Sequence, residues 1–245
     1  MSLITHGGVN LTKNTDASSA IISSAKNEAR NSLLETEAKA ICANYGIPVP
    51  KFEIAKTRDA AADFAEELGF PVVLKIVSPD IIHKSDVGGV IVNLKSRLDV
   101  EKGYDQILAN VKKNAPDSRI VGIEVTQMAP AGVEVIIGSI KDAQFGQTLM
   151  FGLGGVFVEI FKDVAFRIAP VTQEDAKEMI TEIKSYSLLR GYRNTPPSDI
   201  NAIVDILMKL SKIVMDHPEI READLNPTII YQKGAKTVDA RIILE

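Results

Sequence analysis

A polar loop that contains a histidine separates two apolar runs, residues 71–77 and 89–94. It carries the segment His83-Lys84-Ser85-Asp86-Val87-Gly88-Gly89-Val90. A neutral imidazole is nucleophilic and titrates near neutral pH, so it can accept a phosphoryl group and release it. Gly88 and Gly89 allow backbone N–H groups to approach an anion closely. The loop therefore predicts phosphoryl chemistry at His83, with an ordinary surface loop as the alternative.

Two charged residues interrupt apolar segments that have the character of strands. Lys75 lies within residues 71–77, on the same strand face as Val73 and Val77. Because a buried ammonium is costly without an anion, Lys75 must reach solvent or a partner. It is either a phosphate-binding lysine that faces a cleft or a lysine that extends to solvent at a sheet edge. Glu134 could pair with Lys75 or orient a ligand in the same cleft, or it could face solvent.

Oxygen-bearing side chains occur on two β-runs near the C-terminus. Asp224 and Asn226 share one strand face, and Asp239 falls approximately opposite Asn226 across a hairpin turn at residues 232–235. Asp and Asn are poor strand formers, so their presence needs a reason. Hard oxygen donors are the ligands that Mg²⁺ prefers. The hairpin predicts a magnesium site, with solvent-facing polar residues as the alternative.

A glycine-rich segment, residues 151–156, superficially resembles a dinucleotide-binding loop. Phe157 replaces the third glycine, and a β-rich sequence follows in place of a helix, which disfavours a Rossmann domain. No Walker A pattern, zinc-type Cys/His cluster or G-x-S-x-G motif occurs in the sequence. Gly154 and Gly155 could still close over phosphates, and Arg167 could supply a bidentate clamp.

Hydrophobic periodicity predicts an α+β chain with three segments: a mobile arm over residues 1–30, a small lobe over 31–118 and a second lobe over 119–245. Ser32 and Glu35 have the spacing of a helix capping box. The expected helices cover residues 32–45, 57–68, 99–113, 172–184 and 198–215. Beyond residues 71–77 and 89–94, the expected strands cover 119–128, 133–140, 147–151, 156–161, 164–168, 223–231 and 236–244.

Composition bounds the class of protein. The 245 residues include 28 basic and 32 acidic side chains, and this net charge of −4 disfavours a general nucleic-acid binder. A single cysteine, Cys42, fits a reducing cytoplasm, and no apolar run is long enough for a membrane span. We therefore expect a cytoplasmic protein without a signal peptide.

From about Leu33 to the C-terminus, the chain resembles the β subunits, or the equivalent domain of fused enzymes, of ADP-forming acetyl-CoA (acyl-CoA) synthetases. These are ATP-grasp relatives of succinyl-CoA synthetase. The resemblance rests on Glu37-Ala38-Lys39 through Gly46-Ile47-Pro48-Val49-Pro50, Pro71-Val72-Val73-Leu74-Lys75, the His83 segment, Gln127-Met128 with Gly132-Val133-Glu134, Gly152-Leu153-Gly154-Gly155, and Asp224-Leu225-Asn226-Pro227.

The resemblance implies an ATP-grasp fold whose two lobes sandwich ATP or ADP with Mg²⁺. His83 matches a histidine that relays phosphate between a phosphohistidine on an α subunit and ADP. The resemblance also assigns Lys75 to phosphate binding and the hinge from Glu124 through Gln127 to Met128 to contact with adenine. It assigns Glu134 to a position facing the nucleotide, and Asn226 and Asp239 to Mg²⁺ binding. Because a CoA-binding domain is missing, the resemblance also implies a CoA-binding α partner, in a heterotetramer.

Two other functions share this fold. One is a non-catalytic, nucleotide-sensing module that regulates an acyltransferase, although the presence of His83 argues against the related branch whose synthetase-like half is inactive. The other is a stand-alone ATP-dependent carboxylate ligase, which needs no histidine relay.

Overall fold

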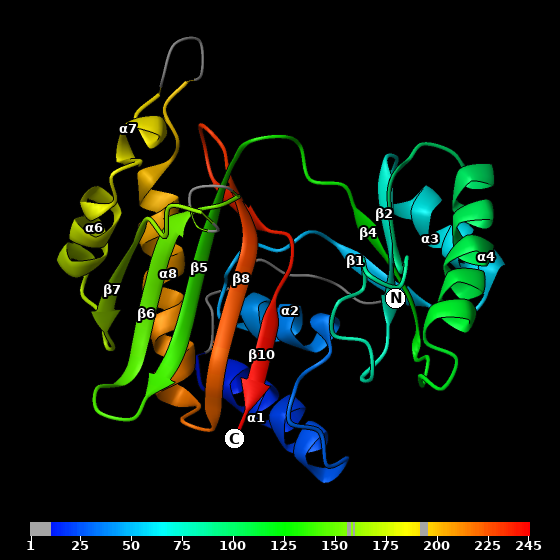
Figure 1. Ribbon diagram of the computed structural model, residues 1–245, viewed down its shortest axis with the longest axis horizontal. Helices are drawn as coiled ribbons and strands as arrows, with labels where there is room; N and C mark the ends of the chain where they lie inside the picture. Colours follow the sequence, from blue (N-terminus) through cyan, green and yellow to red (C-terminus); the bar gives the residue numbers. More distant parts are fainter. Residues whose placement is uncertain (1–10, 156–157, 159, 192–195) are drawn as a thin grey trace.

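The structure is a computed structural model that describes residues 11–155, 158, 160–191 and 196–245 (Figure 1). It contains two antiparallel sheets, and each sheet is the centre of one lobe. The α+β class and the two lobes are therefore confirmed. None of the described helices is both long and apolar enough to cross a lipid bilayer.

The smaller lobe is a four-stranded sheet with two helices on one face. Its strands, in spatial order, are β1 (Phe52–Ala55), β4 (Gly122–Gln127), β2 (Val72–Val77) and β3 (Val90–Leu94). Helices α3 (Arg58–Leu68) and α4 (Arg97–Asn114) bury Ala61, Ala65 and Ile107 against Leu74 and Ile76. Strand alternation turns Lys75 to the opposite face of β2.

The larger lobe is a six-stranded sheet. Its path runs through β10 (Arg241–Leu244), β8 (Ile220–Ile230), β5 (Val133–Asp142), β6 (Gly146–Leu153) and β7 (Val164–Ile168), and β9 (Ala235–Thr237) pairs with β8. Helices α6 (Gln173–Glu182), α7 (Tyr186–Leu189) and α8 (Ile200–Asp216) belong to this lobe. Leu207 of α8 and Phe151 of β6 lie in its apolar core, whereas Phe166 and Ile168 of β7 are exposed.

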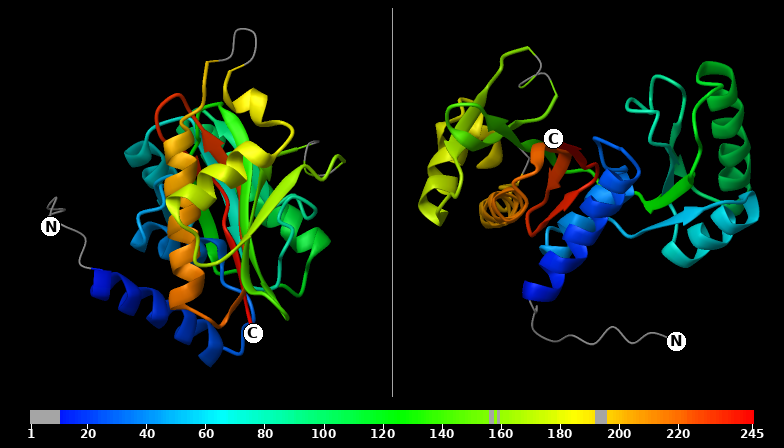
Figure 2. Two further views of the ribbon diagram at one scale, coloured as in Figure 1. Left: turned by 90° about the vertical axis from the view of Figure 1, so that its left-hand side faces the viewer. Right: turned by 90° about the horizontal axis from the view of Figure 1, so that it is seen from below.

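The N-terminal region is helical, and the expectation of a mobile arm over residues 1–30 is wrong for the described part. Helix α1 (Leu11–Asn27) packs against α2 (Glu35–Asn44), and its residues Ile22 and Ala25 are buried in the core of the larger lobe. Figure 2 shows α1 at the underside of the molecule, between the two lobes. The many Ser, Thr and Asn residues concealed a short apolar face that tertiary packing stabilises.

The boundary between the lobes also differs from the expectation. Strand β4 belongs to the smaller sheet, so the chain crosses to the larger lobe at residues 128–132 and not at residue 118. Helix α2 precedes the smaller lobe in sequence but packs in the core of the larger one. The smaller lobe is therefore inserted between α2 and β5. The chain enters and leaves this insert side by side, because the Gln127 N–H donates to the Lys51 carbonyl at 3.0 Å and β1 pairs with β4.

Two local predictions are also corrected. The start of α2 is capped by Glu37, whose Oε2 accepts a hydrogen bond from the Leu34 N–H at 2.8 Å, and not by the expected capping box of Ser32 with Glu35. Of the strand expected over residues 156–161, residues 156, 157 and 159 lie outside the described part, and the others are not in a strand. The sequence did not reveal β1 or α7, and the strand expected over residues 236–244 is divided into β9 and β10. The remaining strands, and the other helices from α2 onward, lie at or near the expected positions.

Candidate functional site

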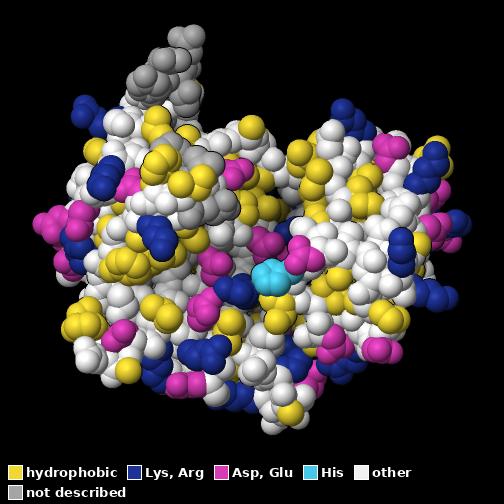
Figure 3. Space-filling view, viewed as in Figure 1, with side chains coloured by type: hydrophobic (Ala, Val, Ile, Leu, Met, Phe, Trp, Pro, Cys, Tyr) yellow, Lys and Arg dark blue, Asp and Glu magenta, His cyan; other side chains and the backbone are white. Residues whose placement is uncertain are grey.

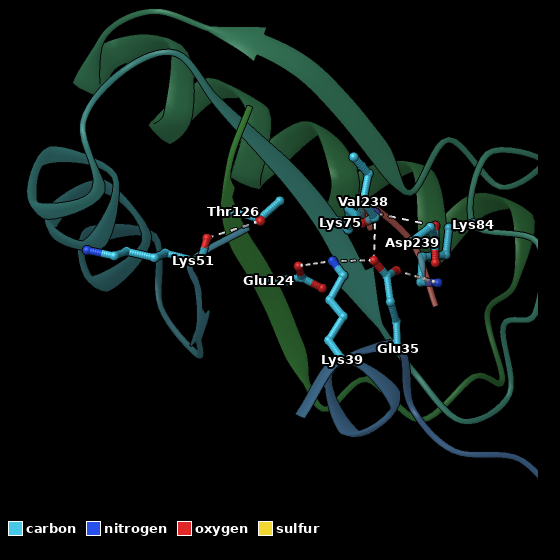
Figure 4. Close-up of polar contacts among 9 residues, drawn as sticks. All are labelled: Glu35, Lys39, Lys51, Lys75, Lys84, Glu124, Thr126, Val238 and Asp239. Atoms are coloured by element: carbon cyan, nitrogen blue, oxygen red, sulfur yellow. Dashed lines mark hydrogen bonds and ion pairs between the residues drawn. The ribbon is translucent and has the colours of Figure 1, made fainter. Parts of the chain in front are cut away.

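Lys75 lies on the inner face of β2, where the larger lobe covers it. Its Nζ lies 2.6 Å from Glu35 Oε1, 3.3 Å from Asp239 Oδ2 and 3.3 Å from the carbonyl oxygen of Val238 (Figure 4). Burial lowers the pKa of Lys75, but the neighbouring carboxylates, Glu35 first, raise it to a net value above the usual one. Lys75 is therefore a buried ammonium at neutral pH, and its partner is Glu35 and not Glu134.

Glu35, the first residue of α2, is surrounded by lysines. Its carboxylate oxygens lie 2.6 Å from Lys39 Nζ, 2.6 Å from Lys75 Nζ and 2.9 Å from Lys84 Nζ. Burial raises the pKa of Glu35, but the three positive charges outweigh that effect and lower it to about 2. Sequence reasoning missed this residue because it assigned Glu35 to the capping box. The available signal was the second carboxylate, Glu37, which can perform the capping alone.

A cavity of about 340 Å³ lies between the lobes and brings several predicted site residues together. Figure 3 shows a hollow between the lobes where acidic, basic and histidine side chains gather. The polar lining residues include His83, Lys84, Asp224, Asn226 and Asp239. Lys75 adjoins this cavity through its contact with Asp239. The histidine loop and the hairpin therefore line one cavity.

The hairpin presents oxygen donors to this cavity. Strand β8 pairs with β9 at Thr228 and Thr237 and with β10 at Asp224 and Arg241, and this register places Asn226 opposite Asp239. Among the described residues, no group of three or more His, Cys, Asp and Glu side chains could hold a metal ion. A cation between Asn226 and Asp239 would therefore complete its shell with ligand oxygens or water, which is how Mg²⁺ binds with nucleotide phosphates.

Asp224 adds a second carboxyl group, beside that of Asp239, to the same wall. Its Oδ1 is buried and has no hydrogen-bond partner among the described residues. Burial raises the pKa of Asp224 to about 6, although Arg241, 3.9 Å away, opposes the shift. Because an unsatisfied buried oxygen is costly, this atom has unused capacity to accept a hydrogen bond.

His83 is exposed on a loop that backbone hydrogen bonds close. The Gly89 N–H donates to the Lys84 carbonyl at 2.7 Å, and the Asp86 N–H donates to the His83 carbonyl at 3.2 Å. The glycines are required by packing: a Cβ on Gly88, which has φ +67°, would lie 2.6 Å from Asn110 Nδ2, and one on Gly89 would lie 2.5 Å from Ile76 Cγ2. The glycines thus fix the loop against β2 and α4.

The glycine-rich segment after β6 folds beside Glu134. The Gly154 N–H donates to the Glu134 carbonyl at 2.9 Å, and a Cβ on Gly154 would lie 3.2 Å from Glu134 Cβ. Gly155 adopts φ +62°, a left-handed conformation that favours glycine. The Glu134 side chain is exposed and lies, by strand alternation, on the sheet face opposite Val135 and the helices.

Some predicted residues do not reach this cavity. Glu124 is fully buried, and its Oε1 accepts from Lys39 at 2.8 Å, so it belongs to the ion-pair network and presents no surface to a ligand. Arg167 shares the helix-facing side of β7 with the buried Ala165 and pairs with Glu182 at 2.8 Å. It therefore does not form the expected clamp. Gln127 and Met128 lie at the end of β4, where the chain crosses between the lobes.

Comparison with known proteins places the chain in a family. A family model described as an ATP-grasp domain matches residues 24–244. The chain is 50% identical over 224 residues to the β subunit of ADP-forming acetate–CoA ligase I from Pyrococcus furiosus, covering 91% of this chain and 96% of the relative. The chain therefore belongs to the ATP-grasp family and, within it, to the β subunits of ADP-forming acyl-CoA synthetases.

Solved structures agree with this assignment. The structure matches the dinucleotide-forming acetyl-coenzyme A synthetase 1 of Candidatus Korarchaeum cryptofilum in complex with coenzyme A and Ca-AMPCP, with a TM-score of 0.92 and 55% identity over 93% of this chain and all of that one. Another structure of that enzyme, which contains a phosphorylated phosphohistidine segment, matches with a TM-score of 0.88 and 53% identity, with the same coverage of both chains.

Proposed function

We propose that this chain transfers phosphate between a phosphohistidine and ADP, as the nucleotide-binding subunit of an ADP-forming acyl-CoA synthetase. The net reaction is acyl-CoA + ADP + phosphate ⇌ acid + ATP + CoA. The observation that carries the proposal is the shared cavity, in which His83 faces the same space as Asn226 and Asp239. A regulatory module that only senses a nucleotide does not require a nucleophile at this position.

The transfer follows from the side chains present. A neutral nitrogen of His83 attacks the phosphorus of the partner's phosphohistidine, so that one P–N bond forms as the other breaks and the partner's imidazole leaves. A terminal oxygen of ADP then attacks the phosphoryl group on His83, forming a P–O bond and releasing the imidazole. The ammonium groups of Lys75 and Lys84 offset the phosphate charge, which is the main requirement of phosphoryl transfer.

We further propose how the nucleotide is held. Asn226 and Asp239 would hold Mg²⁺, which would neutralise phosphate charge when bound. Gly154 and Gly155 would lie over the phosphates with Glu134 beside them, and Gln127 and Met128 would contact the base. These residues belong to both lobes and to the crossing between them, consistent with a nucleotide held between the lobes.

We also propose that the chain works with a CoA-binding α subunit, in a heterotetramer in the cytoplasm. The Pyrococcus relative is named as a β subunit, whereas the chain covers only 29% of ADP-forming acetate–CoA ligase I of Archaeoglobus fulgidus, to which it is 50% identical. The difference in length supports separate α and β subunits for the Pyrococcus relative and a fusion of the two in the Archaeoglobus relative.

The test is the replacement His83→Asn, assayed with the co-purified α subunit, acyl-CoA, ADP and labelled phosphate. We expect turnover to fall at least 1,000-fold, because the relay loses its acceptor atom, and the acid-labile, base-stable label on this chain to disappear. Mg·ADP affinity, measured by calorimetry, should stay within about threefold of wild type, because the lysines and the hairpin remain. Unchanged turnover would exclude the relay, and activity with an amine acceptor without a partner would favour a stand-alone ligase.

A further inference from the structure

Two lysines of the smaller lobe converge on one carboxylate that belongs to the larger lobe. Lys75 comes from β2 and Lys84 from the histidine loop, whereas Glu35 begins α2, a helix packed in the core of the larger lobe. The Glu35 side chain is only 2% exposed, and Lys84 is 17% exposed. Figure 4 shows the three side chains pointing toward one another.

The two oxygens of Glu35 are used differently. Oε1 accepts a hydrogen bond from Lys75 and lies within ion-pair distance of Lys39. Oε2 is buried and lies 2.9 Å from Lys84 Nζ, but no donor has hydrogen-bond alignment with it. A buried carboxylate adds little net stability even when it is paired, so stability alone does not account for this one. Helix capping does not account for it either, because Glu37 performs that role.

We propose that Glu35 is a positioning residue for phosphoryl transfer, which holds Lys75 beside Asp239 and anchors the histidine loop through Lys84. The inference rests on the function proposed above. Lys84 directly follows His83, and it is fixed at two points: its carbonyl accepts from the Gly89 N–H and its ammonium pairs with Glu35. The backbone next to the reacting imidazole is thereby held to the larger lobe, which also carries the hairpin.

The charge of Glu35 has a second consequence. It competes with an incoming polyphosphate for Lys75 and Lys84, so it weakens the attraction of these lysines for the nucleotide. Replacing Glu35 by Gln removes the competing charge and loosens the loop. We therefore expect the KM for ADP to stay equal or fall while kcat falls about tenfold or more, because small displacements of reacting groups are costly in rate.

The experiment compares Glu35→Gln with Glu37→Gln in the complete complex with the α subunit. Glu37 lies in the same helical turn and pairs with Arg30, away from the cavity lysines, so its variant should keep both kcat and KM within about twofold of wild type. Lys84→Met should also lower kcat, because it loses both the anchor and an ammonium group near the phosphates. The double variant should lose less than the product of the two single losses, since the two residues share the Glu35–Lys84 contact. Additive losses would overturn the anchoring role.

A second measurement is independent of turnover. The amides of Asp86, Gly88 and Gly89, which close the loop, should exchange hydrogen about tenfold faster in Glu35→Gln and Lys84→Met but not in Glu37→Gln. Equal exchange and equal kcat in Glu35→Gln and Glu37→Gln would overturn this inference and leave the proposed function intact. A wild-type complex without turnover would refute the proposed function, and the exchange data would still report on the anchor.

Discussion

At the residue scale, the centre of the molecule is a chain of alternating charges. The positive side chains of Lys39, Lys75 and Lys84 alternate with the carboxylates of Glu35, Glu124 and Asp239. Lys39 has no exposed side-chain surface and lies between Glu35 and Glu124. Burial raises the pKa of Glu124, and the Lys39 charge opposes the shift. Glu35 has three lysine partners, whereas Glu124 pairs with Lys39 alone among the described residues, so removal of Lys39 would leave the Glu124 charge buried without an ion-pair partner.

The replacement Lys39→Met is therefore predicted to destabilise the folded protein strongly. We expect the free energy of unfolding to fall by about 3 kcal/mol, because Glu124 loses its ion-pair partner inside the protein. Urea denaturation of the isolated chain measures this. Lys51→Met, at an exposed lysine whose side chain points away from the network, should change stability by less than about 0.5 kcal/mol. Equal losses of stability in Lys39→Met and Lys51→Met would show that Lys39 does not compensate the buried charge of Glu124.

The sequence predicted those site residues that break a local pattern. Lys75 is a charge in an apolar strand, His83 lies in a polar loop between strands, and Asn226 and Asp239 are poor strand formers on a hairpin. Glu35 could not be found in this way, because a carboxylate in the first turn of a helix is ordinary. The prediction for Arg167 failed because the sequence alone did not show that β7 turns this residue toward α6.

At the element scale, the C-terminal ends of α2 and α8 meet through an aromatic contact. The Tyr45 Oη lies 2.8 Å from Asp216 Oδ2 and 3.0 Å from His217 Nε2, and the two rings are in T-shaped contact with centroids 6.0 Å apart. Burial lowers the pKa of His217, although nearby acidic residues oppose the shift. The folded protein therefore favours the neutral imidazole.

This contact predicts a pH dependence of stability. The pKa of His217 is lower in the folded state than in the unfolded state. The stabilisation that the neutral imidazole provides is therefore complete when the pH is above the unfolded-state pKa of about 6.5, and it is lost as the pH falls below that value. Between pH 7.5 and 5.5 we expect the free energy of unfolding of wild type to fall more than that of His217→Gln, because protonation of this buried imidazole favours the unfolded state. Urea denaturation across that range measures it, and parallel curves would contradict the assignment.

Most elements could be predicted from periodicity, but their membership in a lobe could not. The residues of α8 recur at helical spacing, and Thr57 and Gly69 bound α3 as their types predict. By contrast, β4 has the same local character as β5, and nothing in its sequence shows that it pairs with β1 and β2. Pairing between strands depends on contacts distant in sequence, which local patterns do not encode.

At the scale of the whole molecule, a nucleotide bound between the lobes should stabilise both. With Mg·ADP at 100 times its Kd, we expect the free energy of unfolding to rise by about 2.7 kcal/mol, as for any ligand that binds only the folded state. Lys75→Met should reduce this gain at the same ADP concentration, because the phosphates lose an ammonium group. Thermal denaturation with and without Mg·ADP measures both effects, and an equal gain in the variant would remove Lys75 from the nucleotide site.

The smaller lobe is an insert whose first and last strands, β1 and β4, are hydrogen-bonded neighbours. The two ends of the smaller lobe consequently lie next to each other, so the lobe is a self-contained insertion. A short peptide bridge from residue 51 to residue 128 could replace the entire lobe without interrupting the rest of the chain. Exchange of the smaller lobe between homologues would then transfer Lys75, His83 and Lys84 together, while the recipient kept its own Glu35, Lys39 and oxygen donors on the hairpin.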